Sequence, residues 1–140
     1  MMRSLEAWLQ GHAAPPVASW LGMRLVSAGE GTAEAELPVR EDLYNAMGTL
    51  HGGVFCDLAD ATMGAAIASR AAPGETFATT NLTVHLFLPV RDGVMRARAR
   101  LVRRGRRTGY AECDMFTASG DLAARAASSC LFSNPRGEAE

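Results

Sequence analysis

Residues 44–69 have the sequence YNAMGTLHGGVFCDLADATMGAAIAS, and they decide the fold of this 140-residue chain. From Gly52 to Arg70 apolar and small residues predominate, and Pro73-Gly74 provides a stop signal just beyond. This pattern predicts one long buried helix, in which alanine and glycine let a sheet approach the backbone closely. The same helix carries Asp57 and Asp60, which a purely structural helix does not need.

Strand patterns flank this helix on both sides. Residues 23–39 are expected to form two strands about a turn at 29–31, and residues 76–89, 93–104, 108–118 and 122–132 four more strands. Residues 40–50 are expected to form a loop, residues 4–10 a short helix ended by Gly11 and Pro15-Pro16, and residues 134–140 a frayed tail. The fold class is therefore α+β, with a mostly antiparallel six-stranded sheet wrapped around one central helix in a single domain, residues 1–140.

Composition limits the classes of protein to consider. Apolar residues make up 48% of the chain, so we expect a packed core, and no uninterrupted apolar run is long enough for a membrane span. The first residues lack the apolar region of a secretory signal. Three cysteines are too few and too scattered for a disulfide framework or a zinc site, and the three histidines lack metal-ligand spacing. We expect a cytoplasmic protein with no metal and no resident cofactor.

Arginine is distributed unevenly. The chain has no lysine, and eight of its 14 basic residues are arginines between Arg91 and Arg107, where Asp92 is the single acid. Two interpretations are open: a solvated outer face of the sheet, or a docking surface for an anionic ligand, since guanidinium matches phosphate geometry. We do not expect a nucleic-acid partner, because the rest of the chain is acidic and carries no nucleic-acid-binding motif.

The two carboxylates of the helix call for separate explanations. Asp57 and Asp60 are three residues apart and share a helix face. Asp57 lies in the second turn, where a capping or dipole role is sufficient to explain it. Asp60 lies deeper among apolar residues, where a carboxylate is costly unless it is paired or used. A surface stripe on a less buried helix is the alternative for Asp60.

His51-Gly52-Gly53 stands where the helix begins. Free backbone N–H groups at a helix start can donate to a carbonyl or an oxyanion, although the two glycines could equally serve a tight loop. Gly52 and Asp60 are eight residues apart, about 12 Å along a helix axis. If both act on one substrate, Asp60 must come from a second copy of the chain, so the functional interpretation predicts a homodimer with antiparallel central helices.

The pattern N-x-x-G-x-x-H-G-G-x-x-x-x-L-x-D, residues 45–60, resembles the hotdog-fold acyl-CoA thioesterases of the phenylacetic-acid-degradation (PaaI) type. The resemblance continues through the strand-like runs LGMRLVSAGEGTAEAELPV, TTNLTVHLFLPV, RRGRRTGYAECDMF and GDLAARAASSCLF. It implies a hotdog fold, hydrolysis of an aromatic or medium-chain acyl-CoA, and a homodimer that pairs into a dimer of dimers. Coenzyme A would be part of the substrate.

The resemblance also assigns roles to individual residues. It implies that the Gly52 N–H polarises the thioester carbonyl, with His51 and Asn45 beside it, and that Asp60 acts as general base or nucleophile. Thr79 would hold the water or the carboxylate. The arginines that would bind the phosphates of coenzyme A are Arg103, Arg104, Arg106 and Arg107. The sequence departs from the family at Asn81, where relatives often have aspartate.

Three other interpretations compete with this one. A cysteine nucleophile at Cys56 lacks any supporting sequence context. A hotdog hydratase would need a D-x-N-P-x-H run, which is absent. A non-catalytic acyl-CoA-binding protein remains the alternative. Trp8, Trp20 and Phe87 are predicted to be packing residues, and His85 a core or interface histidine.

Overall fold

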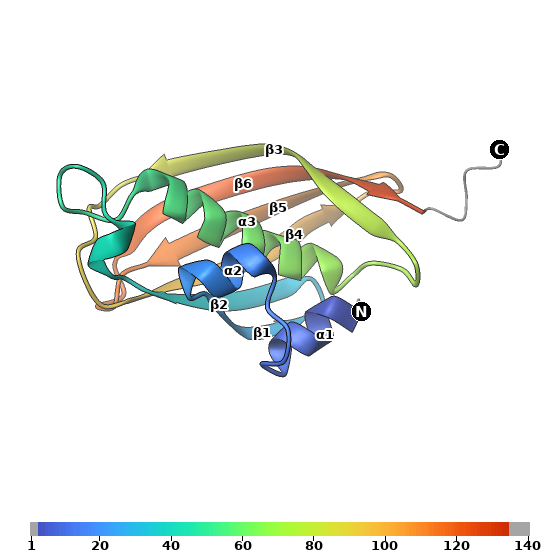
Figure 1. Cartoon of the computed structure of the whole chain (residues 1–140). Helices are drawn as coiled ribbons and strands as arrows, with labels where there is room; N and C mark the ends of the chain where they lie inside the picture. Colours follow the sequence, from blue (N-terminus) through green and yellow to red (C-terminus); the bar gives the residue numbers. More distant parts are fainter. Residues whose placement is uncertain (1–2, 135–140) are drawn as a thin grey trace.

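The structure is a computed structural model, and it describes residues 3–134 (Figure 1). Apart from Asn134, the predicted tail lies outside the described residues. Three helices and one 3-10 turn are present in that range: α1 (Arg3–Leu9), α2 (Pro16–Leu21), α3 (Gly52–Ala68) and η1 (Glu41–Leu43). The strands are β1 (Arg24–Gly29), β2 (Thr32–Pro38), β3 (Thr76–Leu86), β4 (Val94–Arg104), β5 (Thr108–Phe116) and β6 (Leu122–Ser133).

The six strands form one sheet in the order β1-β2-β4-β5-β6-β3, and every neighbouring pair is antiparallel. The sheet curves around α3, which lies along its inner face, while α1 and α2 lie on the other side of α3 from β5 and β6 (Figure 1). The predicted fold class is confirmed. In this strand order β3 is an edge strand, because it pairs with β6 alone among the described strands. This matters for the proposed function, because an edge strand can pair with another chain.

Alternation along the strands explains why the helix settles on this face. In β4 the side chains of Met95, Ala97 and Ala99 are buried while the arginines between them are exposed, as the sequence predicts. Ala35 of β2 pairs with Ala97, so small residues stand side by side across the sheet. They face a helix that is itself rich in alanine, and the close approach leaves Leu58 of α3 with no exposed surface.

The segment before β1 differs from the prediction. The short helix predicted over residues 4–10 is α1, which ends at Leu9 as expected. A second helix, α2, was not predicted: it begins at Pro16, a position where proline is favoured because the first helical N–H needs no partner. Gly22, with a φ of 80°, closes α2 in the left-handed conformation. Trp20 was expected to pack, and this is wrong: its side chain is 79% exposed. Trp8 of α1 is buried, as predicted.

A β-bulge interrupts β3 close to the predicted site. Thr79 pairs with Cys130 and Asn81 pairs with Ser129, so Thr80 is an extra residue in the strand. Bulges redirect the side chains that flank them. Both side chains are exposed, but Thr79 donates to Asp60 on α3, whereas Asn81 accepts a hydrogen bond from Thr83 on its own strand.

Candidate active site

The start of α3 presents one free backbone donor. The Gly53 N–H donates to Nδ1 of His51 over 2.9 Å, and the Val54 N–H donates to the carbonyl of His51. His51 is therefore the N-cap of α3, and the bond fixes its ring with Nδ1 as acceptor. The Gly52 N–H has no hydrogen-bond partner among residues 3–134. A helix N-terminus with one unpaired N–H is suited to bind a carbonyl oxygen or an oxyanion.

Gly52 also has a steric reason to be glycine. A Cβ at this position would lie 3.1 Å from Cδ1 of Leu86, at the end of β3. The backbone of the helix start is therefore in close contact with the edge strand. A side chain at residue 52 would crowd Leu86.

Asn45 organises the loop that leads to this donor. Its side-chain oxygen accepts hydrogen bonds from the Met47 and Thr49 N–H groups, and its amide nitrogen donates to Oγ1 of Thr49 over 2.9 Å. The backbone N–H of Asn45 donates to the Thr49 carbonyl, which closes the loop. In this structure Asn45 shapes the loop before the helix, and its predicted role toward the carbonyl or the water stays a prediction.

Asp60 and Thr79 are brought together from different elements. The Thr79 hydroxyl, on β3, donates to Oδ1 of Asp60, on α3, over 3.1 Å. Asp60 is half-buried, so it lies on the boundary between the core and the open face of the helix. The hydroxyl orients one carboxylate oxygen and leaves the other available to a water or a substrate.

These residues make two half-sites in one chain. His51, Gly52 and Asn45 lie at or just before the start of α3. Asp60 lies two turns further along the helix, with Thr79 of β3 bonded to it. Eight residues of helix separate Gly52 from Asp60 by about 12 Å, which no hydrogen bond spans. The structure thus brings the predicted residues into two groups, and a single chain does not join them.

Asp57 belongs to the second half-site and not to the helix cap. His51 caps α3, so Asp57 does not cap it, and the dipole role expected as the other possibility stays a prediction. Desolvation by the surrounding groups, and then the neighbouring charge of Asp60, raise the pKa of the Asp57 carboxyl above its ordinary value. The two carboxylates line the same groove, described next, and their spacing in the sequence was the signal that places them together.

An apolar groove of about 530 Å³ opens beside Asp60 and Thr79. Its walls come from α1, the connection between α1 and α2, the start of α2, one face of α3 and the first residues of β3. The lining includes the side chains of Leu5, Trp8, Val17 and Phe77, together with Gly64. Sequence reasoning missed this groove, because it depends on where α1 and α2 fold back.

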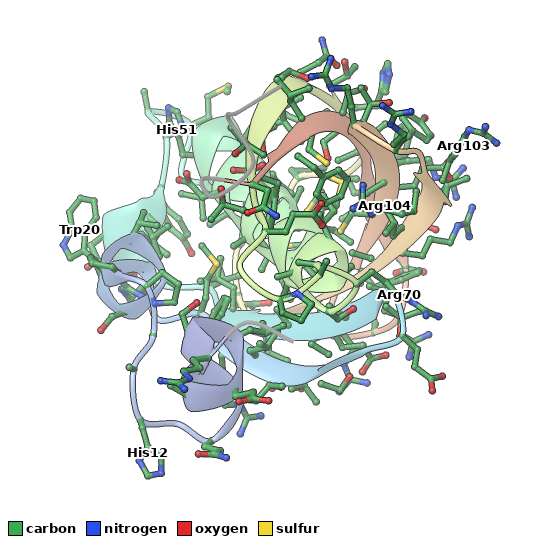
Figure 2. The ribbon with its side chains drawn as sticks, turned by 90° about the vertical axis from the view of Figure 1, so that its right-hand side faces the viewer. His12, Trp20, His51, Arg70, Arg103 and Arg104 are labelled. Carbon is green, nitrogen blue, oxygen red and sulfur yellow. The ribbon has the colours of Figure 1, made fainter. Side chains whose placement is uncertain are left out.

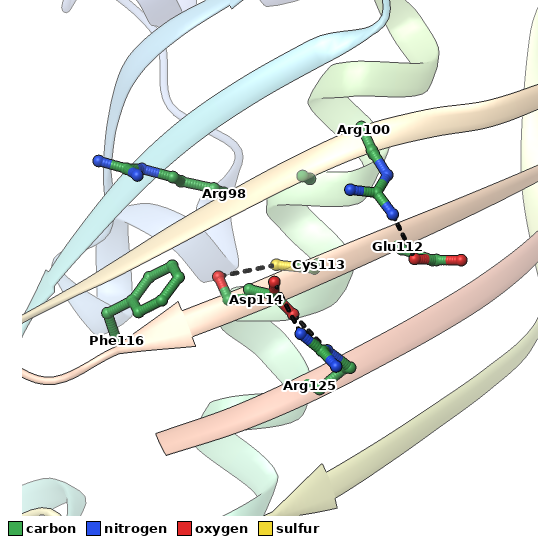
Figure 3. Close-up of a pocket in the computed structure, with 8 residues that line it drawn as sticks. Arg98, Arg100, Glu112, Cys113, Asp114, Phe116 and Arg125 are labelled. Carbon is green, nitrogen blue, oxygen red and sulfur yellow. Dashed lines mark hydrogen bonds and ion pairs between the residues drawn. The ribbon is translucent and has the colours of Figure 1, made fainter. Parts of the chain in front are cut away.

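The arginine run divides into two parts. On the outer face of the sheet, Arg98 pairs with Glu34, Arg100 with Glu112, and the more distant Arg125 with Asp114, as Figure 3 shows for the last two. The solvated-face interpretation holds there. The second part lies at the turn between β4 and β5, on the opposite side of the molecule from His51 (Figure 2).

Of the four arginines predicted to bind phosphate, Arg104 is engaged within the chain. It donates to Glu75 over 2.6 Å, and its guanidinium carbon lies 3.4 Å from the centre of the Phe132 ring. Arg103, Arg106 and Arg107 are exposed and have no ion-pair partner in the described part of the chain. Their role toward coenzyme A stays a prediction.

Residues 3–134 contain neither a clustered set of metal ligands nor a membrane-spanning helix. That range holds no group of three or more His, Cys, Asp or Glu side chains arranged to bind a metal. No helix within it has the length and apolar character to cross a membrane. His85, predicted to be a core or interface residue, is exposed in the single chain.

A curved antiparallel sheet of six strands wrapped around one central helix is the hotdog fold of thioesterases. Residues 47–124 match the thioesterase superfamily, and the chain belongs to that family.

Similar proteins agree with this assignment. Human acyl-coenzyme A thioesterase 13 is 31% identical over 105 residues, which cover 72% of this chain and 73% of the human protein. The solved structure of a Haemophilus influenzae thioesterase matches with a TM-score of 0.87 and 26% identity, covering 100% of this chain and 97% of that one. A phenylacetic acid degradation-related protein of Ralstonia eutropha matches with a TM-score of 0.83 and 26% identity, covering 92% and 99%. The resemblance stated from the sequence is confirmed.

Proposed function

We propose that the chain hydrolyses the thioester of an aromatic or medium-chain acyl-CoA, in a site shared between two subunits. The observation that carries the proposal is the unpaired Gly52 N–H at the start of α3, together with Asp60, eight residues further on and held by Thr79. A thioester carbonyl needs a polarising donor and a carboxylate at the same point. Within one chain the two groups are too far apart, so we propose that one subunit supplies the donor and a second subunit supplies the carboxylate.

Each group has a defined role in the reaction. The Gly52 N–H of one subunit donates to the thioester oxygen and stabilises the negative charge that develops there. Asp60 of the other subunit removes a proton from water as the water oxygen attacks the carbonyl carbon. The C–S bond then breaks, and the leaving thiolate of coenzyme A takes up the proton. Alternatively, the Asp60 carboxylate attacks the carbon itself, the C–S bond breaks and the thiolate of coenzyme A leaves; water then hydrolyses the resulting anhydride, and a proton from that water goes to the thiolate.

Support for a homodimer comes from β3. This edge strand has unpaired backbone groups along its free side, and the residues at its end, Leu86, Phe87 and Leu88, are 52%, 52% and 41% exposed. Phe87 was predicted to pack, and within one chain it does not. Pairing of two β3 strands would cover these side chains and set the two helices side by side. We propose that such dimers pair again into a dimer of dimers.

A thiol-release assay with a panel of acyl-CoA esters tests this function. Asp60→Asn keeps a side chain that can accept the Thr79 hydrogen bond but removes the charge, and we expect it to abolish turnover while the dimer persists. Thr79→Ala should slow turnover, because Asp60 loses the hydroxyl that orients it. Thr32→Ala is the matched control, because Thr32 is exposed on β2, away from the β3 edge, and its hydroxyl also makes one hydrogen bond; this variant should leave the rate unchanged. Binding of acyl-CoA without thiol release by the unmodified protein would favour the non-catalytic acyl-CoA-binding alternative.

We propose that Arg103, Arg106 and Arg107, with a smaller part for Arg104, bind the phosphates of coenzyme A. Their exposed guanidinium groups support this role. Replacing Arg103 by Gln should raise the KM for acyl-CoA but not for the same acyl group on pantetheine, which lacks the nucleotide phosphates. Arg125→Gln, which removes an ion pair of the outer sheet face, is the control.

The proposed chemistry uses no metal and no resident cofactor, since an amide donor, a carboxylate and water complete it. The three cysteines are free thiols, which suits a reducing compartment, and we propose the cytoplasm.

A further inference from the structure

We propose that the groove between α1 and α3 holds the acyl group of the substrate, and that Gly64 sets how much of that group fits. The inference rests on the proposed function, because it takes Asp60 as the reacting carboxylate. The groove includes Asp60 and Thr79 and continues along α3 past Gly64 to Ala68, about 12 Å from Asp60 at the helical rise. Figure 1 shows α1 beside the second half of α3, where this groove lies.

Gly64 is the residue that the packing of the chain does not explain. It lies in the interior of α3, where glycine is less favourable than alanine. A Cβ added to Gly64 would meet only Cζ of Phe77, at 4.0 Å, which is an ordinary contact. No close approach and no unusual backbone angle therefore requires glycine. What the missing side chain leaves open is space in the groove.

The residues that line the groove determine which kind of acyl group fits it. Trp8, Leu5, Val17 and Phe77 offer apolar surface, and the volume of about 530 Å³ is typical of a small-molecule site. The ionisable side chains in the lining are two carboxylates, Asp57 and Asp60, with no cation among the described lining residues. An acyl group with its own carboxylate would be repelled, so the groove suits an uncharged, apolar acyl group.

Variants at Gly64 test the assignment. Gly64→Ala should raise the melting temperature, yet lower the ratio of kcat/KM for octanoyl-CoA to that for acetyl-CoA by about tenfold, since the lost space is that of a methyl group. Gly64→Leu should lower the ratio further. Gly29→Ala is the matched control, because a Cβ at Gly29 would meet no heavy atom within 4 Å, and Gly29 has an ordinary φ and lies outside the groove.

Charge gives a second comparison that needs no variant. Hexanoyl-CoA and adipoyl-CoA have acyl groups of equal carbon number, but the second ends in a carboxylate. Hexanoyl-CoA should be hydrolysed with the larger kcat/KM. Equal values for the two esters, or an unchanged octanoyl-to-acetyl ratio in both Gly64 variants, would overturn the inference. A change in oligomeric state of the Gly64 variants would also overturn it, and would instead assign the groove to a second copy of the chain.

A binding measurement separates this inference from the proposed function. Trp8 is 8% exposed and lines the groove, whereas Trp20 is 79% exposed, so Trp20→Phe leaves one reporter tryptophan. In the Asp60→Asn background, an acyl-CoA brominated at the end of a medium chain should quench Trp8 emission, and coenzyme A alone should not. Quenching without turnover in the unmodified protein would contradict the function and keep the groove. Turnover without quenching would contradict the groove and keep the function.

Discussion

Replacing Gly52 by proline should remove the proposed oxyanion donor while leaving the helix in place. Proline has no N–H, and residue 52 is the first residue of α3, where proline is well tolerated. His51 precedes it with φ −62° and ψ 136°, an extended conformation that a following proline accepts. The substitution therefore deletes one hydrogen-bond donor, and the contact of its Cβ with Leu86 is one that Gly52→Ala shares.

The size of the effect follows from the role of the donor. Loss of one oxyanion donor typically lowers kcat by about 100- to 1,000-fold, or roughly 3–4 kcal/mol of transition-state stabilisation. Gly52→Ala is the matched control. Its Cβ meets Leu86 at the same 3.1 Å, but it keeps the N–H, so it should retain far more activity than Gly52→Pro. Both are measured by thiol release, with melting temperatures to confirm folding.

Mixing subunits then tests whether the site is shared. Asp60→Asn and Gly52→Pro chains are each expected to be inactive alone. When the two chains are combined in equal amounts, half of the dimers contain one chain of each kind. Each mixed dimer has one of its two sites intact, so the mixture should show about a quarter of the wild-type activity. Equal activity in Gly52→Pro and Gly52→Ala would refute the donor role, and no recovery on mixing would refute the shared site.

Three further predictions concern stability and reactivity. Leu58→Ala should lower the free energy of unfolding by about 2–5 kcal/mol in a denaturant titration, because Leu58 is completely buried in the core; a loss below about 1 kcal/mol would mean that α3 is loosely packed. The raised pKa of Asp57 means that its contribution to stability is fully present below its ordinary pKa of 3.8 and is lost as the pH rises through the raised value. Asp57→Asn should therefore melt higher than the unmodified protein at pH 7, with the gap closing in acid. Burial, and then Asp114, raise the pKa of Cys113 to about 12, so iodoacetamide at pH 8 should label Cys113 after unfolding but not in the native state.

The fold could be predicted from the sequence because buried and exposed residues alternate clearly along several strands and one long segment is mostly apolar. Alternation in β2 and β4 and one long apolar helix specify a sheet with one covered face. The helix α2 was missed because Pro16 is ambiguous: the same residue that ends a preceding helix can begin the next one. The bulge at Thr80 was missed because threonine suits a strand with or without an extra residue.

The candidate site was predictable only in part, for a related reason. The free amide at Gly52 follows from glycines at a helix start, and the face shared by Asp57 and Asp60 follows from their spacing. The partnership of Asp60 with Thr79 came from the resemblance to a family, since residues 19 apart on different elements carry no local signal. Neither local spacing nor the family resemblance predicted the groove, because the tertiary packing of α1 and α2 creates it.

In the proposed mechanism, the central helix is the reason that the site needs two chains. A helix is a rigid spacer, so the distance between Gly52 and Asp60 is fixed by eight residues and cannot be closed by a loop movement. Two groups eight residues apart on one helix do not meet within a chain. In the proposed dimer, an antiparallel neighbour would bring them together twice, once on each side of the two-fold axis. The same helix carries Gly64 beyond Asp60, so a single element would fix the donor, the carboxylate and the depth of the acyl groove.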